Sequence, residues 1–205
     1  MPSSPSAADA SSAIPAGEAI AIPCYVSGKG MYATEWTRHF KLKVIHLLES
    51  TGLGYDTRYR YYRKQFPDMD PQALAAMVCQ PIEYYDKDWP SYRAAHGAGR
   101  DEDEVITAFV MERDGWFRCE AQAAIYCYDE AGFGSGVNSM RFIQAGTPIL
   151  GFYNPAVRDM RINLHNVMQL QAEFSTLVTL VRYRALEEIR PTLVTWLHDL
   201  RTHTR

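Results

Sequence analysis

Two acidic residues and three glycines fall within one eight-residue stretch of this sequence, residues 129–136, which reads D-E-A-G-F-G-S-G. Glycines let backbone N–H groups come close to a ligand, and a helix that starts after them offers its N-terminus to an anion or a sugar hydroxyl. The carboxylates of Asp129 and Glu130 add groups for nucleophilic or acid/base chemistry. The alternative interpretation is a flexible surface turn, in which glycine is also common.

Another carboxylate, that of Glu112, falls among the apolar positions of a predicted helix. Acidic residues occupy positions 101–104, where they favour a helix N-terminus. Apolar residues from Val105 to Trp116 then recur at helical spacing, and Glu112 occupies one position of that series. If Glu112 faces a pocket, desolvation raises its pKa and suits it to protonate a leaving group. The alternative is a structural carboxylate satisfied by an arginine or a backbone donor.

The elements around residues 129–136 alternate between apolar runs and helical patterns. An apolar run at 121–128 predicts a strand that ends at Asp129, residues 139–145 predict a short helix, and residues 148–153 predict a further strand. Earlier in the chain, residues 19–25 predict a buried strand. A helix from Thr34 to a stop at Gly52 and a strand over 54–59 complete a βαβ unit.

This alternation predicts an α/β fold, a flavodoxin/Rossmann-like parallel sheet of about five strands flanked by helices. Ligands of such sheets bind beyond the carboxyl ends of the strands, and residues 129–136 lie at such an end. The first 17 residues, rich in Ser, Ala and Pro, are interpreted as a flexible leader. Residues 18–205 are interpreted as one domain.

The remaining segments carry weaker patterns. Between residues 60 and 100 we expect one short helix at 71–79 and otherwise loop, because prolines interrupt the segment. Residues 163–174 predict a helix, residues 176–183 a fifth strand buried on both faces, and residues 186–200 a closing helix. Residues 58–64 interleave bases with tyrosines, which could clamp a phosphate or stack on a base. We favour a solvated loop with packed tyrosines for these residues.

Three motifs in order give the sequence a family resemblance. The runs A-A-I-Y-C-Y-D-E, G-F-G-S-G-V and A-G-T-P-I-L-G-F-Y resemble the core of the nucleoside 2-deoxyribosyltransferases. Glu112 with Gly115 resembles the D-x-x-G of that family, and residues 161–165 (R-I-N-L-H) resemble its I-N-L-M segment. The resemblance covers roughly residues 19–170.

The resemblance implies cleavage of the bond between a nucleobase and C1′ of its sugar through a covalent sugar–enzyme ester. Such chemistry needs a carboxylate nucleophile, and alignment puts Asn138 at its place, or Met140 if the helix is shifted by two residues. An amide is a poor nucleophile. Asp129 or Glu130 would therefore have to supply the carboxylate, or the protein binds without catalysing, and Asn138 could instead cap the helix. Glu112 is the expected acid/base group.

Further residues are expected to contact a nucleoside or nucleotide by the same resemblance. Asn163 would hydrogen-bond sugar hydroxyls, and His165 could contact a substrate carboxylate or phosphate. The remaining substrate-binding candidates, which surround the strand ends, are Tyr25, Ser27, Gly28, Glu130, Gly134 and Gly136. The resemblance also implies a homo-oligomer.

Composition narrows the classes of partner. The net charge of −3 and the pI of about 6.1 give no general attraction for nucleic acid. The four cysteines form no C-x-x-C pair, so we expect no metal, no disulfide framework and a cytoplasmic location. No apolar run is long enough for a membrane span, and no cofactor is expected. A TIR-like NAD hydrolase stays open as an alternative, whereas residues 27–30 are too short a signal for a phosphate-binding loop.

Overall fold

The computed structural model describes residues 21–29 and 33–203, with the side chains of residues 158–163 and 203 outside the described set. Its centre is one five-stranded sheet in the order β2-β1-β3-β4-β5, in which all neighbouring strands are parallel. The strands are β1 (Ile22–Ser27), β2 (Gly54–Asp56), β3 (Ala123–Cys127), β4 (Ile149–Tyr153) and β5 (Val178–Arg182). The predicted flavodoxin/Rossmann-like α/β fold is confirmed. The predicted leader, residues 1–17, lies outside the described residues.

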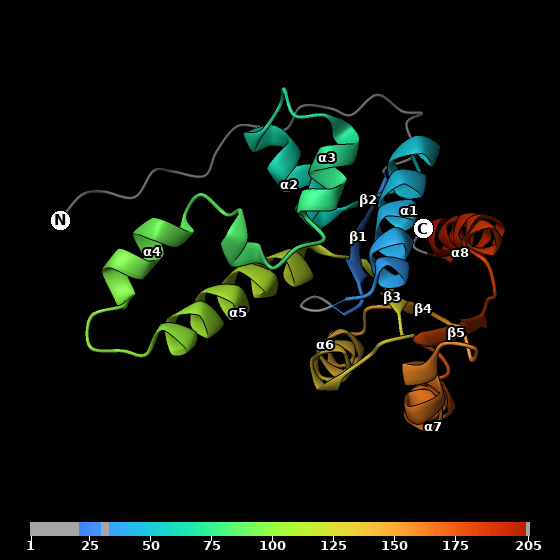
Figure 1. Cartoon of the computed structure of the whole chain (residues 1–205). Helices are drawn as coiled ribbons and strands as arrows, with labels where there is room; N and C mark the ends of the chain where they lie inside the picture. Colours follow the sequence, from blue (N-terminus) through green and yellow to red (C-terminus); the bar gives the residue numbers. More distant parts are fainter. Residues whose placement is uncertain (1–20, 30–32, 204–205) are drawn as a thin grey trace.

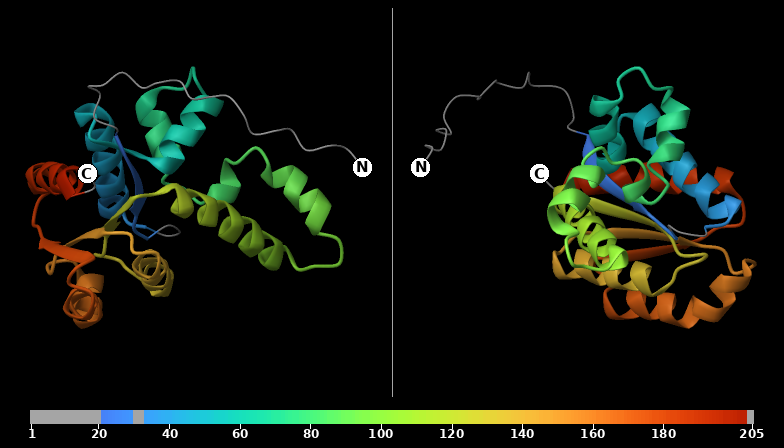
Figure 2. Two further views of the ribbon diagram at one scale, coloured as in Figure 1. Left: turned by 180° about the vertical axis from the view of Figure 1, so that it is seen from behind. Right: turned by 60° about the vertical axis from the view of Figure 1, so that its left-hand side comes forward.

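Helices cover both faces of the sheet (Figures 1 and 2). Helices α1 (Glu35–Thr51) and α8 (Ile189–His203) lie on one face, and α5 (Glu102–Glu120), α6 (Phe133–Gln144) and α7 (Arg158–Glu173) lie on the other. Right-handed crossovers produce this arrangement, because the chain moves from β1 outward to β2 and then back across β1 to β3. No described helix combines the length and apolar character needed to cross a bilayer.

A crevice opens where β1 and β3 end, because the strand order reverses there: β2 is added on one side of β1, and β3, β4 and β5 are added on the other. The chain leaves β1 toward α1 on one face and leaves β3 toward α6 on the opposite face. Because the connections from these two neighbouring strands run to opposite faces of the sheet, neither connection covers the space between their carboxyl ends. The fold itself therefore places a ligand crevice beside residues 27–29 and 128–138.

Local signals explain the helix boundaries that were predicted correctly. Helix α1 ends at Gly52, whose φ of 65° is the left-handed conformation that glycine adopts without strain. Helix α3 (Pro71–Met77) matches the short helix expected at 71–79, and the Asp70 side chain caps it by accepting from the N–H groups of Gln72 and Ala73.

The expectation of loop elsewhere between residues 60 and 100 is wrong. This segment holds most of α2 (Thr57–Gln65), the 3₁₀ turn η1 (Ile82–Tyr84) and α4 (Trp89–His96). Pro90 stands in the first turn of α4, where a missing N–H costs no hydrogen bond. The strand predicted over 54–59 is also too long, because the Asp56 side chain accepts from the Tyr59 N–H and starts α2.

Two more expectations need correction. Helix α6 begins at Phe133 with Gly132 as its N-cap, so residues 129–136 are only in part a loop and Asn138 lies within the helix rather than capping it. Strand β5 is not buried on both faces, because it is the last strand of the sheet and Thr179 and Arg182 are exposed. The short 3₁₀ turn η2 (Leu186–Glu188) precedes α8.

Candidate functional site

A cavity of about 540 Å³ lies at the carboxyl ends of β1 and β3. Its walls come from the end of β1, from α1 and α2, from the segment around η1, from the inner side of α5 and from the start of α6. A volume in this range suits one small organic ligand. Its polar lining residues include Tyr25, Ser27, Lys29, Lys41, Arg58, Gln80, Glu83, Tyr85, Thr107, Asp114, Glu130, Ser135 and Asn138.

Most of the residues singled out from the sequence line this one cavity. They are Tyr25, Ser27, Gly28, Glu130, Gly134 and Asn138. Gly136 instead lines a second cavity of about 620 Å³ between α6 and α7, with mainly apolar walls. His165 is exposed and lines neither cavity, and the side chain of Asn163 lies outside the described residues.

Glu112 does not face the cavity, and the expectation that it lies on the buried face of its helix is wrong. Its side chain is exposed, whereas Ile106, Val110 and Asp114 line the cavity at four-residue intervals along α5. At about 100° per residue, Glu112 lies two positions and more than half a turn away from Asp114. The carboxylate that α5 presents to the cavity is therefore that of Asp114, which sequence reasoning missed.

Asp114 belongs to a chain of polar contacts across the floor of the cavity. The Tyr25 hydroxyl donates a hydrogen bond of 3.0 Å to Asp114 Oδ1. Arg118 lies 3.6 Å from Asp114 Oδ2 and donates a hydrogen bond of 3.1 Å to Asn138 Oδ1. Burial and the neighbouring Asp114 raise the pKa of Tyr25, so its hydroxyl stays a neutral donor. The Asp114 side chain keeps 21% of its surface exposed and is accessible to a ligand.

Asp129 points into the protein interior and does not line the cavity. Its carboxylate accepts hydrogen bonds from Trp36 Nε1 at 2.8 Å, from the Asn154 N–H and from the Tyr183 hydroxyl. Burial raises the pKa of Asp129, and these hydrogen bonds only partly offset the effect. Asp129 thus ties the end of β3 to α1 and to the segments that follow β4 and β5.

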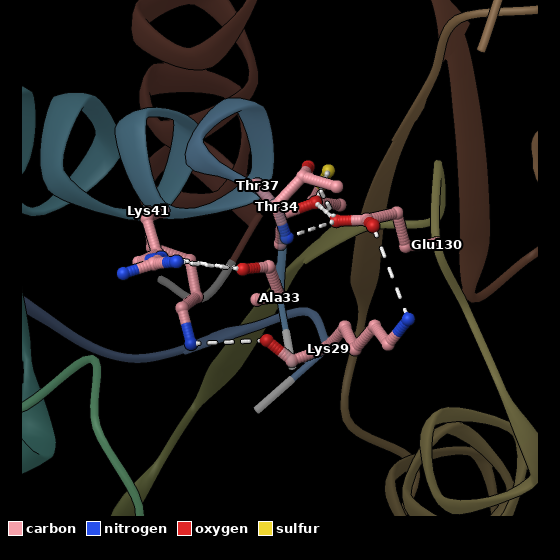
Figure 3. A network of polar contacts seen from close by, with 8 residues as sticks. Lys29, Ala33, Thr34, Thr37, Lys41 and Glu130 are labelled. Carbon is pink, nitrogen blue, oxygen red and sulfur yellow. Dashed lines mark hydrogen bonds and ion pairs between the residues drawn. The ribbon is translucent and has the colours of Figure 1, made fainter. Parts of the chain in front are cut away.

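Glu130 faces the other way and holds the start of α1 (Figure 3). Glu130 Oε2 accepts from Thr34 N at 3.1 Å, from Thr34 Oγ1 at 2.8 Å and from the Thr37 hydroxyl, and Lys29 lies 3.9 Å from Oε1. Burial alone would raise the pKa of Glu130, but the hydrogen bonds from Thr37 and Thr34, together with Lys29, lower it below its ordinary value. An ionised Glu130 therefore occupies the positive end of the α1 dipole.

A buried and a largely buried cation line the wall of the cavity formed by α1 and α2. Lys41, on α1, has 3% of its surface exposed and donates to the carbonyls of Lys29 and Cys79. Arg58, on α2, has 11% of its side chain exposed and lies over the Tyr25 ring at 4.7 Å. The solvated-loop interpretation of residues 58–64 is therefore wrong for Arg58. Arg60 is exposed as that interpretation expected, but it too lies in helix α2 and not in a loop.

The sequence does contain a pattern that indicates burial of Lys41. Thr37, Lys41, Val44 and Leu48 repeat at i, i+4, i+7 and i+11, so a lysine occupies the apolar stripe of α1. A lysine at such a position is either extended to solvent or held by buried acceptors, and the second holds here.

The described residues contain no cluster of three or more histidine, cysteine or acidic side chains that could hold a metal ion. Comparisons with protein-family models, with curated proteins and with solved structures found no match to this chain.

Proposed function

We propose that the chain binds a nucleoside or nucleotide in the cavity at the ends of β1 and β3 and cleaves its N-glycosidic bond. The observation that carries this proposal is the Asp114 carboxylate, which lines the cavity and accepts a hydrogen bond of 3.0 Å from Tyr25. A carboxylate positioned by a neutral donor can attack C1′ or activate water. The motif order that resembles the nucleoside 2-deoxyribosyltransferases supports a sugar at this place.

The proposed reaction consumes one water molecule and yields a free base and a free sugar. Asp114 either forms an ester with C1′ that water then hydrolyses, or removes a proton from the water that attacks C1′. Glu83, a partly buried carboxyl group in the cavity wall, is available to protonate the departing base. We assign the role of nucleophile or base to Asp114 and not to Asp129 or Glu130, because the carboxylates of Asp129 and Glu130 accept several hydrogen bonds from the protein itself.

A second candidate is a binding module without catalysis. It is favoured by Asn138, whose amide oxygen accepts from Arg118 where the resemblance expects a nucleophilic carboxylate. With its oxygen turned to Arg118, the amide presents N–H donors elsewhere and binds an acceptor rather than attacking a carbon. In this case the protein should bind a nucleoside or nucleotide without releasing its base.

Base release from a panel of nucleosides, their 5′-monophosphates and NAD, followed by chromatography, separates these candidates. The wild-type chain should release a base, and Asp114→Asn should lower the rate by at least about 100-fold, in the range that loss of a general acid or base costs. Glu112→Gln is the matched control, two residues away on the exposed side of α5, and should keep the full rate. Saturable binding without base release would favour the module, and nicotinamide release from NAD alone would favour the TIR-like alternative.

A further inference from the structure

Three cationic side chains line one wall of the cavity, the wall formed by the end of β1, α1 and α2. Lys29, Lys41 and Arg58 all line this wall. Lys41 is almost fully buried, Arg58 is largely buried, and Lys29 has 35% of its side chain exposed. Burying a cation is costly unless an anion or several acceptors compensate it. The contacts of each cation therefore indicate whether the protein itself neutralises this wall.

Lys41 has no carboxylate partner among the residues that the structure describes. Its ammonium group donates to the Cys79 carbonyl at 3.1 Å and to the Lys29 carbonyl at 3.4 Å, the second of which is drawn in Figure 3. An ammonium has three N–H donors, so these two carbonyls leave one donor for another acceptor. Carbonyl oxygens are dipoles and leave the charge of Lys41 uncompensated.

Within the described part of the chain, Arg58 keeps one N–H donor without a partner, although it donates to the Val26 carbonyl and forms an ion pair with Asp56. It lies 3.6 Å from Asp56 Oδ2, which already accepts from the Val26 N–H at 3.0 Å, while Asp56 Oδ1 accepts from the Tyr59 N–H. The Arg58 Nε is buried without a hydrogen-bond partner among the described residues. A guanidinium with an unused donor is suited to a planar or tetrahedral oxyanion.

The N-terminus of α1, which follows the first strand, does not compete as an anion site. The Glu130 carboxylate already accepts from Thr34 N there and lies 3.9 Å from Lys29. Lys41 thus has no carboxylate partner among the described residues, and Arg58, which is paired with Asp56, keeps one buried N–H donor unused. Both line the cavity, and the Tyr25 ring under Arg58 carries the hydroxyl that reaches Asp114.

Resting on the proposed function, we propose that the ligand of this cavity is a nucleoside monophosphate whose phosphate lies between Lys41 and Arg58. A phosphate monoester carries close to two negative charges at neutral pH, which matches one ammonium and one guanidinium. With the phosphate at this wall, the sugar comes to lie over Tyr25 and beside Asp114. The cavity thus distinguishes a nucleotide from a nucleoside by charge.

Calorimetric titration of the full chain with a nucleoside, with its 5′-monophosphate and with inorganic phosphate alone tests this inference. The monophosphate should bind at least about tenfold more tightly than the nucleoside. Lys41→Met should reduce this ratio to near one, because methionine fills the buried site without charge. Lys43→Met, on the same helix but outside the cavity lining, is the matched control and should keep the ratio. The wild-type ratio tests the proposal even if Lys41→Met fails to fold.

Each remaining outcome overturns the inference. Equal affinities of the wild-type chain for nucleoside and monophosphate would exclude a phosphate subsite, yet base release from nucleosides would still uphold the proposed function. Inorganic phosphate that binds as tightly as the nucleotide would make the two cations a separate phosphate site. An unchanged ratio in Lys41→Met would exclude Lys41 from the subsite. Absence of binding by every ligand would overturn the inference and the proposed function together.

Discussion

At the scale of single residues, the same carboxylate chemistry has different uses within a short stretch of chain. Asp129 and Glu130 are neighbours in sequence, yet the pKa of Asp129 is raised by burial and that of Glu130 is lowered by the donors of Thr37 and Thr34, against the effect of burial. Asp114 lines the cavity, and Glu112 faces solvent. Environment, and not residue type, therefore decides which carboxylate can act on a ligand.

Glu130→Gln should lower stability at neutral pH by about 1–3 kcal/mol, because it removes a charged acceptor from buried donors. The folded-state pKa of Glu130 lies below its ordinary value of 4.5, so its stabilisation is complete above that value and is lost as pH falls through the folded-state pKa. The stability difference between wild type and variant should therefore shrink in acid. Urea unfolding between about pH 7 and about pH 3.5 measures this difference.

The matched control for this titration is Glu112→Gln, since Glu112 is an exposed glutamate. A surface substitution of this kind should change stability by no more than about 0.5 kcal/mol. A difference for Glu130→Gln that stays constant from neutral to acid pH would contradict the role of an ionised Glu130 at the start of α1.

At the scale of helices and strands, the spacing of apolar residues predicted the elements of the fold better than the positions of polar residues predicted the cavity lining. The runs that became β1, β3 and β4 were evident because parallel strands are buried on both faces. Helix α5 was also predicted, but the side of the helix that faces the cavity was not. The apolar residues of this helix lie both on the side that packs in the core and on the side that lines the cavity. For this reason Glu112 was expected at the cavity, which Asp114 lines instead.

Contacts distant in sequence could not be predicted. Lys41 meets the Cys79 carbonyl across 38 positions, and Arg58 meets the Val26 carbonyl across 32. These contacts depend on how α2 packs beside β1 and how α3 packs beside α1 and α2. The short helix at α3 was expected, but α2 was not, so neither contact could be placed from the sequence. The predicted parallel sheet placed the expected pocket at the strand ends, where a cavity lies, whereas the cationic wall follows only from tertiary structure.

Two glycine-to-alanine changes should shift stability in opposite directions. A Cβ at Gly151, in β4, would overlap the Tyr128 ring and lie 2.7 Å from Leu180 Cδ2. Tyr128 cannot easily move, because it stacks on Tyr126 at 5.1 Å and shares a hydrogen bond of 2.9 Å with Ser139. Gly151→Ala should therefore destabilise the fold by about 1–3 kcal/mol, as overpacking does.

A Cβ at Gly136, in α6, meets no atom within 4 Å. Gly136→Ala should stabilise the protein by about 0.5–1 kcal/mol, because alanine loses less backbone entropy than glycine in a helix. Midpoints of urea unfolding for both variants and the wild type give the two signs. A stabilising Gly151→Ala would contradict the close packing of β4 against Tyr128.

At the scale of the whole molecule, two cavities lie near the end of β3, and only one has convergent polar groups. The cavity between α6 and α7 has mainly apolar walls, whereas the cavity between α5 and α1 brings together Asp114, Lys41 and Arg58 from segments far apart in sequence. Open parallel sheets bind ligands at the point where the strand order reverses, which in this sheet lies between β1 and β3. The topology and the polar groups thus favour the same cavity.

Hydrogen exchange with the tightest-binding nucleoside monophosphate should locate the ligand within the fold. Amides of residues 79–85, of the first turns of α6 and of the end of β1 should gain protection, because the ligand closes their access to water. Helix α8, on the opposite face of the sheet beside α1, is the internal control and should exchange as in the free protein. Protection confined to residues 140–144 and 166–170 would instead place the ligand between α6 and α7, and would contradict a site built around Asp114.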